Sequence, residues 1–235
     1  MGESQVVAGG TDAARSRNAH LVPRIWNGLT AALVLLGIVM DVVWAARAGA
    51  GTFGSPAAHA FNIFAYFTVQ SNIVVGVTTL LLALRWDRGT GADWRSTLFR
   101  VFRLDGLIMI IVTAVVYHAV LEPLLDLHGW DLFSDQIVHT VVPAFCIFGW
   151  LLWGPRRLVS WRIVGWCVVY PILWVVFTLV RGAITHWYPY PFMDVDELGY
   201  LHASLNLLGI TVAFLALAAG ALGVDRLLGR RGARV

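Results

Sequence analysis

A small group of polar and ionisable side chains interrupts the apolar stretches of this 235-residue sequence. The group comprises Asp41, Thr68, Gln70, Ser71, Asn72, His118, Glu122, His139, Arg181, His202 and Asn206. Polar groups are costly to bury in apolar surroundings, so each needs a partner or a function. Hydroxyl, imidazole, carboxylate and guanidinium groups can supply a nucleophile, a general base, or a ligand for a metal or an anion.

The composition indicates which elements position these groups. Hydrophobic residues make up 58% of the chain and charged residues 13%, whereas soluble domains average about 25% charged residues. This excludes a disordered chain, a nucleic-acid-binding module and an ordinary soluble enzyme. Six stretches reach the roughly 20 apolar residues that a membrane span needs; they are 25–46, 60–84, 104–125, 135–153, 161–181 and 200–222. The sequence predicts an all-α, polytopic integral membrane protein with six transmembrane helices in one bundle.

The 17 basic residues, all arginine, indicate the orientation of this bundle. Fifteen of them flank the spans on one side: Arg15, Arg17, Arg24, Arg85, Arg88, Arg95, Arg100, Arg103, Arg156, Arg157, Arg162, Arg226, Arg230, Arg231 and Arg234. Only Arg47 and Arg181 remain for the other side. By the positive-inside rule, both termini are expected in the cytoplasm of a bacterial cell. We expect a disordered cytoplasmic tail over 1–22, a transmembrane domain over 23–225 and a basic cytoplasmic tail over 226–235.

The chain direction places most of the polar groups in the outer half of the bilayer. At 1.5 Å per residue, Thr68 lies roughly 12 Å below the outer edge, and His118, His139 and Asn206 lie within about 5–11 Å of it. Charges that faced lipid would be expelled, so a shared depth predicts a polar cavity that opens toward the outer leaflet.

Each position also has a structural interpretation. Thr68 could donate to the carbonyl group of Phe64, four residues earlier in its helix. An intramembrane histidine can tie two helices together. Arg181 could pair with Asp194 or Glu122, or it could bind a substrate carboxylate through its planar guanidinium.

Four local patterns add a resemblance to a known family. They are Tyr66-Phe67-Thr68-Val69-Gln70-Ser71-Asn72, Val116-Tyr117-His118, His139-Thr140-Val141-Val142-Pro143, and Arg181-Gly182 followed by Trp187-Tyr188-Pro189-Tyr190-Pro191-Phe192-Met193-Asp194. Together they resemble the bacterial Pr6Pr family of six-span membrane proteins, from about Ile25 to Leu222. That family is remotely similar to the androgen-induced membrane proteins of animals. Those are multi-pass hydrolases that cleave fatty acid esters of hydroxy fatty acids with an intramembrane threonine and a histidine.

The resemblance implies a threonine-dependent hydrolase of a lipid ester. Thr68 corresponds to the threonine nucleophile and His139 to the histidine, which would act as general base. Asp135, one helical turn before His139, is a candidate to orient its ring. Asn72, on the same helix face as Thr68, could donate to an oxyanion or fix a helix contact.

The other candidates are assigned to the pocket or its border. His118 is expected to line the pocket or to act as an alternative base, and Ser71, His202 and Asn206 are expected to support it. Trp187, Tyr188 and Tyr190 are expected to cover the pocket at the membrane interface, or to form an ordinary aromatic belt. The expected partners are membrane lipid and a fatty acyl ester substrate, with no nucleic acid, nucleotide or cofactor.

Two other functions fit the same polar groups. A non-enzymatic protein could bind or transport a lipid or a small anion in this cavity without needing the Thr68 hydroxyl. A haem or metal site could use His118, His139 and His202, because imidazole is a common ligand for both. No two of these histidines have helical i,i+3 or i,i+4 spacing, so the sequence does not predict a metal site.

Overall fold

The computed structural model describes residues 3–85 and 96–231, and for residues 3–20, 85 and 231 it describes the backbone alone. Six helical segments are long and apolar enough to cross a membrane. They are Leu21–Arg47, Phe67–Leu84, Thr97–Leu124, Trp130–Trp153, Trp161–Thr185 and Val195–Arg230. No strand occurs in the described parts of the chain. The prediction of an all-α fold with six helices long and apolar enough to span a membrane is confirmed, although several boundaries differ.

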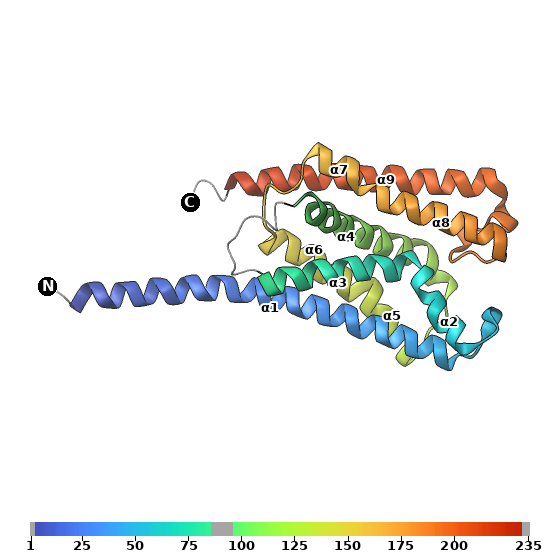
Figure 1. Cartoon of the computed structure of the whole chain (residues 1–235), viewed down its shortest axis with the longest axis horizontal. Coiled ribbons are helices and arrows are strands. Elements are labelled where there is room, and N and C mark those ends of the chain that lie inside the picture. Colours follow the sequence, from blue (N-terminus) through green and yellow to red (C-terminus); the bar gives the residue numbers. More distant parts are fainter. Residues whose placement is uncertain (1–2, 86–95, 232–235) are drawn as a thin grey trace.

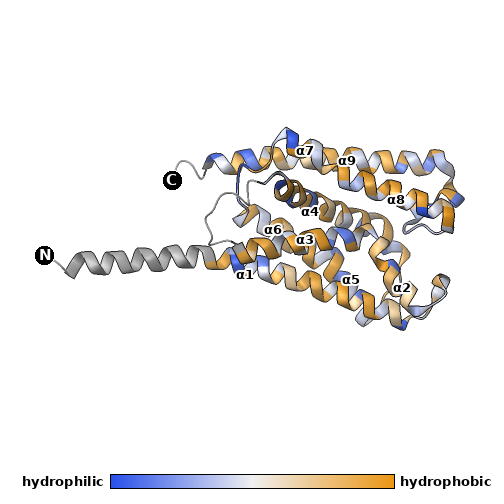
Figure 2. Cartoon of the chain, in the orientation of Figure 1, coloured by the Kyte–Doolittle hydropathy of each residue, from blue (hydrophilic) through white to orange (hydrophobic). Residues whose placement is uncertain are grey.

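The six segments run side by side along the long axis of the molecule (Figure 1). The start of α1 (Glu3–Arg47) and the end of α9 (Val195–Arg231) lie at the same end of this bundle. Apolar residues cover the long helices over most of their length (Figure 2). Many of them face outward, including Leu35, which is 66% exposed, and Ile184, which is 74% exposed. An apolar surface of this extent is typical of a protein that contacts lipid.

The second span is interrupted, whereas the sequence predicted one helix over 60–84. A short helix α2 (Pro56–Asn62) begins after Ser55, whose hydroxyl caps it by accepting from the N–H of Ala58 at 3.1 Å. A 3₁₀ turn η2 (Ile63–Ala65) follows, and Tyr66 then adopts an extended backbone before α3 (Phe67–Arg85) begins. Thr68 therefore lies in the first turn of α3, where backbone N–H groups have no partner within the helix.

Two π-helical turns occur, one near the end of the third apolar segment and one within the fourth. The first, η4 (Tyr117–Leu121), continues α4 (Thr97–Val116) and is followed by η5 (Glu122–Leu124). The second, η6 (Ile137–Val141), joins α5 (Trp130–Gln136) to α6 (Val142–Trp153). Each precedes a proline, Pro123 or Pro143. A proline cannot donate to the carbonyl group four residues earlier, and a widened turn accommodates that loss.

Close packing of α1 fixes the position of η6. A Cβ atom on Gly37 would lie 2.5 Å from Cγ1 of Val138, so only glycine allows this approach. The fifth apolar segment consists of two consecutive helices, α7 (Trp161–Cys167) and α8 (Val169–Thr185). A loop containing the 3₁₀ turn η7 (Pro191–Met193) connects α8 to α9.

The described parts of the two predicted tails are helical. The backbone is helical from Glu3 onward, although residues 1–22 were expected to be disordered. Extending a helix that has already formed requires no new nucleation, which accounts for this continuation. At the other end, α9 continues to Arg231. Arg88, Arg95 and Arg234, which contributed to the predicted orientation, lie outside the described residues, as do the side chains of Arg15, Arg17, Arg85 and Arg231.

Candidate active site

A cavity of about 400 Å³ lies near the end of the bundle opposite the chain termini. It is bounded by α1, α2, the start of α3, η4, α5, η6 and the loop that follows α8. Its polar lining includes Asp41, His59, Thr68, Asp131, Asp135, His139 and Tyr190. The volume is within the roughly 300–1,000 Å³ typical of ligand pockets. A cavity that Thr68 and His139 both line is therefore present in the structure, as the sequence predicts.

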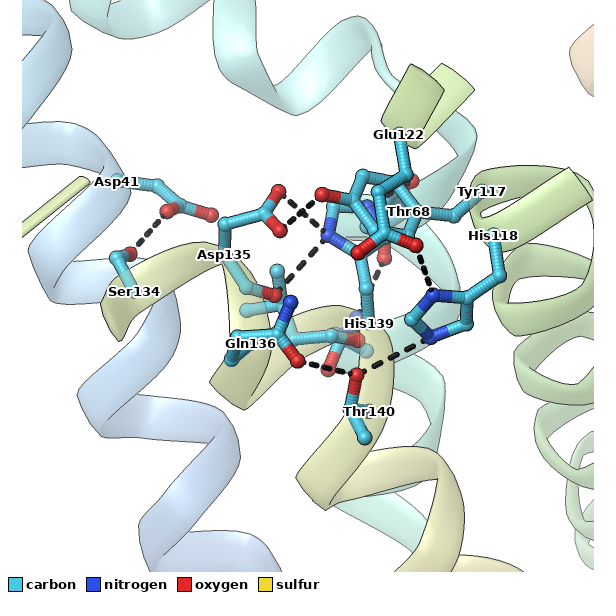
Figure 3. A network of polar contacts seen from close by, with 12 residues as sticks. Asp41, Thr68, Tyr117, His118, Glu122, Ser134, Asp135, Gln136, His139 and Thr140 are labelled. Carbon is cyan, nitrogen blue, oxygen red and sulfur yellow. Dashed lines mark hydrogen bonds and ion pairs between the residues drawn. The ribbon is translucent and has the colours of Figure 1, made fainter. Parts of the chain in front are cut away.

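Thr68 and His139 face each other in this cavity (Figure 3). The Thr68 Oγ1 atom lies 3.4 Å from Nε2 of His139, although the two residues are 71 positions apart. Thr68 is contributed by the first turn of α3 and His139 by the π turn η6. The separation is slightly longer than the 2.6–3.2 Å of a tight catalytic hydrogen bond, as is common in structures without substrate.

Asp135 holds the other side of the His139 ring. Its Oδ1 atom lies 2.9 Å from Nδ1 of His139, one helical turn away. Tyr117 donates its hydroxyl proton to the second oxygen of the same carboxylate. The Tyr117 ring also stacks on the imidazole, with centroids 3.8 Å apart and planes inclined by 13°. The orienting role predicted for Asp135 agrees with this geometry, and Tyr117 completes the support.

Tyr190 supplies a second group that contacts Thr68. The Thr68 N–H, unpaired within α3, donates to the Tyr190 hydroxyl at 3.2 Å, and Oγ1 of Thr68 lies 3.3 Å from the same oxygen. Burial raises the pKa of Tyr190 to about 12, so the side chain is a neutral phenol at physiological pH. Its proton can therefore point toward Oγ1.

These contacts are compatible with a direction of proton donation that suits catalysis. In it Tyr190 donates to Oγ1 of Thr68, and Thr68 donates to Nε2 of His139. The proton on Nδ1 of His139 then faces Asp135. In this pattern the Nε2 lone pair is directed at the threonine hydroxyl. A neutral imidazole in this position can act as a general base.

The structural alternative for Thr68 is not observed. The Phe64 carbonyl group accepts from the side-chain amide of Gln70 at 2.9 Å, and the Thr68 hydroxyl is directed at the cavity. Ser71 and Asn72 contact the backbone of Thr68 and not its hydroxyl. Both donate to the backbone carbonyl group of Thr68, at 2.8 and 2.9 Å, and Asn72 also donates to that of Val138 at 3.2 Å. Of the two roles considered for Asn72, the structure therefore favours the helix contact.

His118 lies outside the cavity and does not line it as expected. Its Nδ1 atom is 2.6 Å from Glu122, and its Nε2 atom is 3.1 Å from the hydroxyl of Thr140. The side chains of His118 and Glu122 are 39% and 46% exposed. Figure 3 shows His118 joined by dashed lines to Glu122 and Thr140.

Arg181 pairs with neither acidic residue considered for it. Its guanidinium donates to Oδ1 of Asn62 at 2.5 Å and lies 4.6 Å from the centre of the Trp187 ring. The adjacent Gly182 allows the Tyr188 ring to lie directly on α8, because a Cβ atom there would be 2.0 Å from that ring. The Arg181-Gly182 pair therefore fastens the aromatic loop to α8, and Arg181 does not line the cavity.

His202 and Asn206 lie on exposed positions of α9 and do not reach the cavity. His202 contacts the carbonyl group of Leu198 at 3.2 Å, and Asn206 donates to that of Phe192 at 2.8 Å. Asn206 thus anchors the loop that carries Tyr190. The structure does not bring His118, His139 and His202 together, and the described residues contain no group of three His, Cys, Asp or Glu side chains placed to hold a metal.

Sequence reasoning missed Tyr117 and the direct role of Tyr190. Tyr117 is only 2% exposed, and a tyrosine buried in an apolar span needs a hydrogen-bond partner, which is the signal that could have identified it. Tyr190 was expected to be part of an interface cover, but it is buried and reaches inward. Asp41 also lines the cavity, where it accepts from Ser134 at 2.5 Å.

Comparisons with known protein families, with curated proteins and with solved structures found no match. The resemblance to the Pr6Pr family therefore stays a prediction, and the candidate site is supported by the geometry of the chain itself.

Proposed function

We propose that this chain is an integral protein of a bacterial plasma membrane that hydrolyses fatty acyl esters. Both termini would lie in the cytoplasm, which would place the cavity in the outer half of the bilayer. Six long apolar helices and an outward-facing apolar surface support insertion into the membrane. The proposed activity and its two principal residues agree with the family resemblance described above.

One observation carries the proposal: the connected series Thr68–His139–Asp135 at the wall of a ligand-sized cavity. A hydroxyl, a neutral imidazole and an orienting carboxylate are the parts that acyl-transfer enzymes combine on unrelated folds. Here they come from α3, η6 and α5, and the Tyr117 ring stacks on the base.

In the acylation step, Oγ1 of Thr68 attacks the ester carbonyl carbon while Nε2 of His139 removes its proton. The tetrahedral intermediate then collapses. The bond to the alcohol oxygen breaks, and the imidazolium of His139 returns the proton to that leaving oxygen. The products are a free alcohol and an acyl group on Thr68, with Asp135 stabilising the transient positive charge of His139.

In the second step, water attacks the acyl carbon and gives its proton to His139. The bond from Oγ1 to the acyl carbon breaks, and the proton passes from His139 to Thr68. This restores the enzyme and releases a fatty acid. The backbone N–H groups of the first turn of α3 and the Tyr190 hydroxyl are the nearest donors for the oxyanion, and the positive end of the helix dipole at Thr68 favours negative charge there.

Hydrolysis of p-nitrophenyl butyrate by the purified protein tests this proposal. We expect turnover by the natural chain and none above background for Thr68→Val, which removes the hydroxyl but keeps the branched shape. Thr78→Val is a matched control, because Thr78 is buried in the same helix and its hydroxyl donates to the Val74 carbonyl group at 2.8 Å.

Full turnover by Thr68→Val would contradict the proposal. If neither the natural chain nor Thr68→Val hydrolysed the ester but both bound a lipid or a small anion equally well, the function would be binding or transport and not hydrolysis.

A further inference from the structure

A second, smaller cavity of about 160 Å³ adjoins the candidate site. Side chains from α3, α4, α8 and α9 and from the loop that carries Tyr190 form its walls. Its described lining contains no charged residue; its polar groups are limited to three threonines and Tyr190. Buried apolar side chains such as Val112, Trp174 and Phe214 dominate the interior. Such a cavity is suited to a hydrocarbon chain.

Thr68 and Tyr190 line both cavities, so they lie on the partition between them. The Tyr190 ring is held there by Phe192, stacked at 5.2 Å, and by Trp174 at 6.1 Å. The candidate nucleophile is therefore accessible from two sides that differ in chemistry. One side carries carboxylates and imidazoles, and the other is apolar.

The small cavity also reaches the outer surface of the bundle. Ile172 and Val176, one helical turn apart on α8, line it and are 50% and 52% exposed. In a membrane this surface would face lipid. A hydrocarbon chain would therefore have a lateral path from the bilayer to Thr68.

The position of the base determines which part of an ester occupies which cavity. His139 lines the large cavity and not the small one. During acylation it must return a proton to the alcohol oxygen, so that oxygen has to lie on the large-cavity side of Thr68. The acyl group, attached to the opposite side of the carbonyl carbon, is then directed across the partition.

We infer that the small cavity is the acyl-chain subsite, and that the alcohol portion of the ester binds in the large cavity. This inference rests on the proposed hydrolase function and deepens it. The substrate class is an ester of a straight acyl chain with a polar or bulky alcohol, because the large cavity offers Asp41, His59 and Asp131 as polar contacts. Water for the second step reaches the acyl carbon from the same side once the alcohol has left.

Filling the small cavity tests the assignment of the two subsites. Val112→Phe, which adds a ring at a residue that is 7% exposed, is paired with Val115→Phe, which lies one turn away on α4 and is 60% exposed. The substrates are p-nitrophenyl octanoate, with the chain on the acyl side, octyl acetate, with the chain on the alcohol side, and p-nitrophenyl acetate as reference. Each buried methylene is worth roughly a fourfold factor, so displacing two of them lowers kcat/KM about fifteenfold.

We expect this loss only for p-nitrophenyl octanoate with Val112→Phe. A selective loss for octyl acetate would reverse the assignment, and an equal response of the two variants would overturn it. Ile210→Phe on α9, which also lines the small cavity, and Val212→Phe, which is 59% exposed, provide a second pair if Val112→Phe does not fold.

Binding of radiolabelled octanoate separates failure of this inference from failure of the hydrolase proposal, because it needs no turnover. We expect the natural chain and Val115→Phe to bind it equally, and Val112→Phe to bind it about fifteenfold more weakly. Equal binding by Val112→Phe would contradict the subsite even if Thr68 proved to be the nucleophile. Weaker binding by Val112→Phe without any hydrolysis would support the apolar site and reject the reaction.

Discussion

Two histidines in this bundle have almost the same neighbours, but only one of them faces a cavity. His139 lies between a carboxylate, Asp135, and a threonine hydroxyl, that of Thr68. His118 lies between Glu122 and Thr140. Each histidine belongs to a π turn and each carboxylate is four residues away, so the pairs share their local architecture (Figure 3). The contacts of His118 are even the shorter ones.

The two groups differ in the direction of their hydrogen bonds. The hydroxyl of Thr140 donates to Oε1 of Gln136 at 2.8 Å, so it can only accept from His118. Nε2 of His118 therefore donates to Thr140. A ring nitrogen that donates has no lone pair with which to remove a proton from threonine. In the direction of donation described for the cavity, Nε2 of His139 instead keeps a lone pair toward Thr68.

The two groups also differ in how exposed their side chains are and in whether they line the large cavity. The side chains of His139 and Asp135 are 12% and 11% exposed, whereas those of His118 and Glu122 are 39% and 46% exposed. His139 lines the large cavity, and His118 does not. A series of threonine, histidine and carboxylate is therefore insufficient for catalysis. The threonine hydroxyl must also donate its proton to the histidine, and the group must line a space that can hold the substrate.

Replacing each histidine gives the largest contrast between the two groups. We expect His139→Ala to lower kcat/KM for p-nitrophenyl butyrate by roughly a thousandfold or more, because the base is lost. His118→Ala should retain activity within about twofold. Thermal unfolding of both proteins serves as the folding control, and comparable activity losses in the two variants would remove the distinction.

Replacing the two carboxylates should also lower activity more in the His139 group than in the His118 group, but by a smaller factor. Asp135→Asn keeps the shape of the side chain but loses the charge that orients and stabilises His139, so we expect a decrease in kcat of roughly a hundredfold to ten-thousandfold. Glu122→Gln should change kcat by less than about twofold. Steady-state kinetics on the same ester measures both, and an unaffected Asp135→Asn protein would show that the carboxylate has no part in the reaction.

Tyr190 belongs to the Thr68 group and has no counterpart beside Thr140. Tyr190→Phe removes the hydroxyl that contacts both the N–H and Oγ1 of Thr68, and we expect kcat to fall about tenfold with little change in KM. Tyr188→Phe, in the same loop and also buried, is the control. A rise in KM at constant kcat would instead assign Tyr190 to substrate binding.

The smallest effect is expected for Thr140→Val. Its hydroxyl proton is bonded to Gln136 and its side chain is exposed, so ester hydrolysis should stay within about twofold of the natural chain. A strong loss of hydrolysis in this variant would indicate that the outer group is the site of chemistry.

The sequence was sufficient to predict six long apolar helices and the proximity of Thr68 to His139. Length and hydropathy predicted the helices, while the common depth of the two residues and the family resemblance predicted their proximity. The relation of Asp135 to His139 was also predictable, because a spacing of four residues places both on one helix face.

The rotation of each helix about its axis was not predictable. His118 and His139 have similar depths, and only tertiary packing directs one inward and the other outward. The interruption at Tyr66 was hidden as well, because residues 63–66, where the helix breaks, read Ile-Phe-Ala-Tyr and contain no glycine or proline. Tyr190 reaches Thr68 across 122 residues, through a loop that Gly182 and Asn206 fasten to its neighbours. Local spacing carries no signal for such a contact.

Covalent labelling with a fluorophosphonate, followed by mass-spectrometric mapping, identifies which threonine acts as the nucleophile. We expect the purified protein to carry the label on Thr68, the His118→Ala protein to be labelled equally, and the His139→Ala protein to be unlabelled. A label on Thr140, or a label on Thr68 that persists in His139→Ala, would contradict the proposed pair.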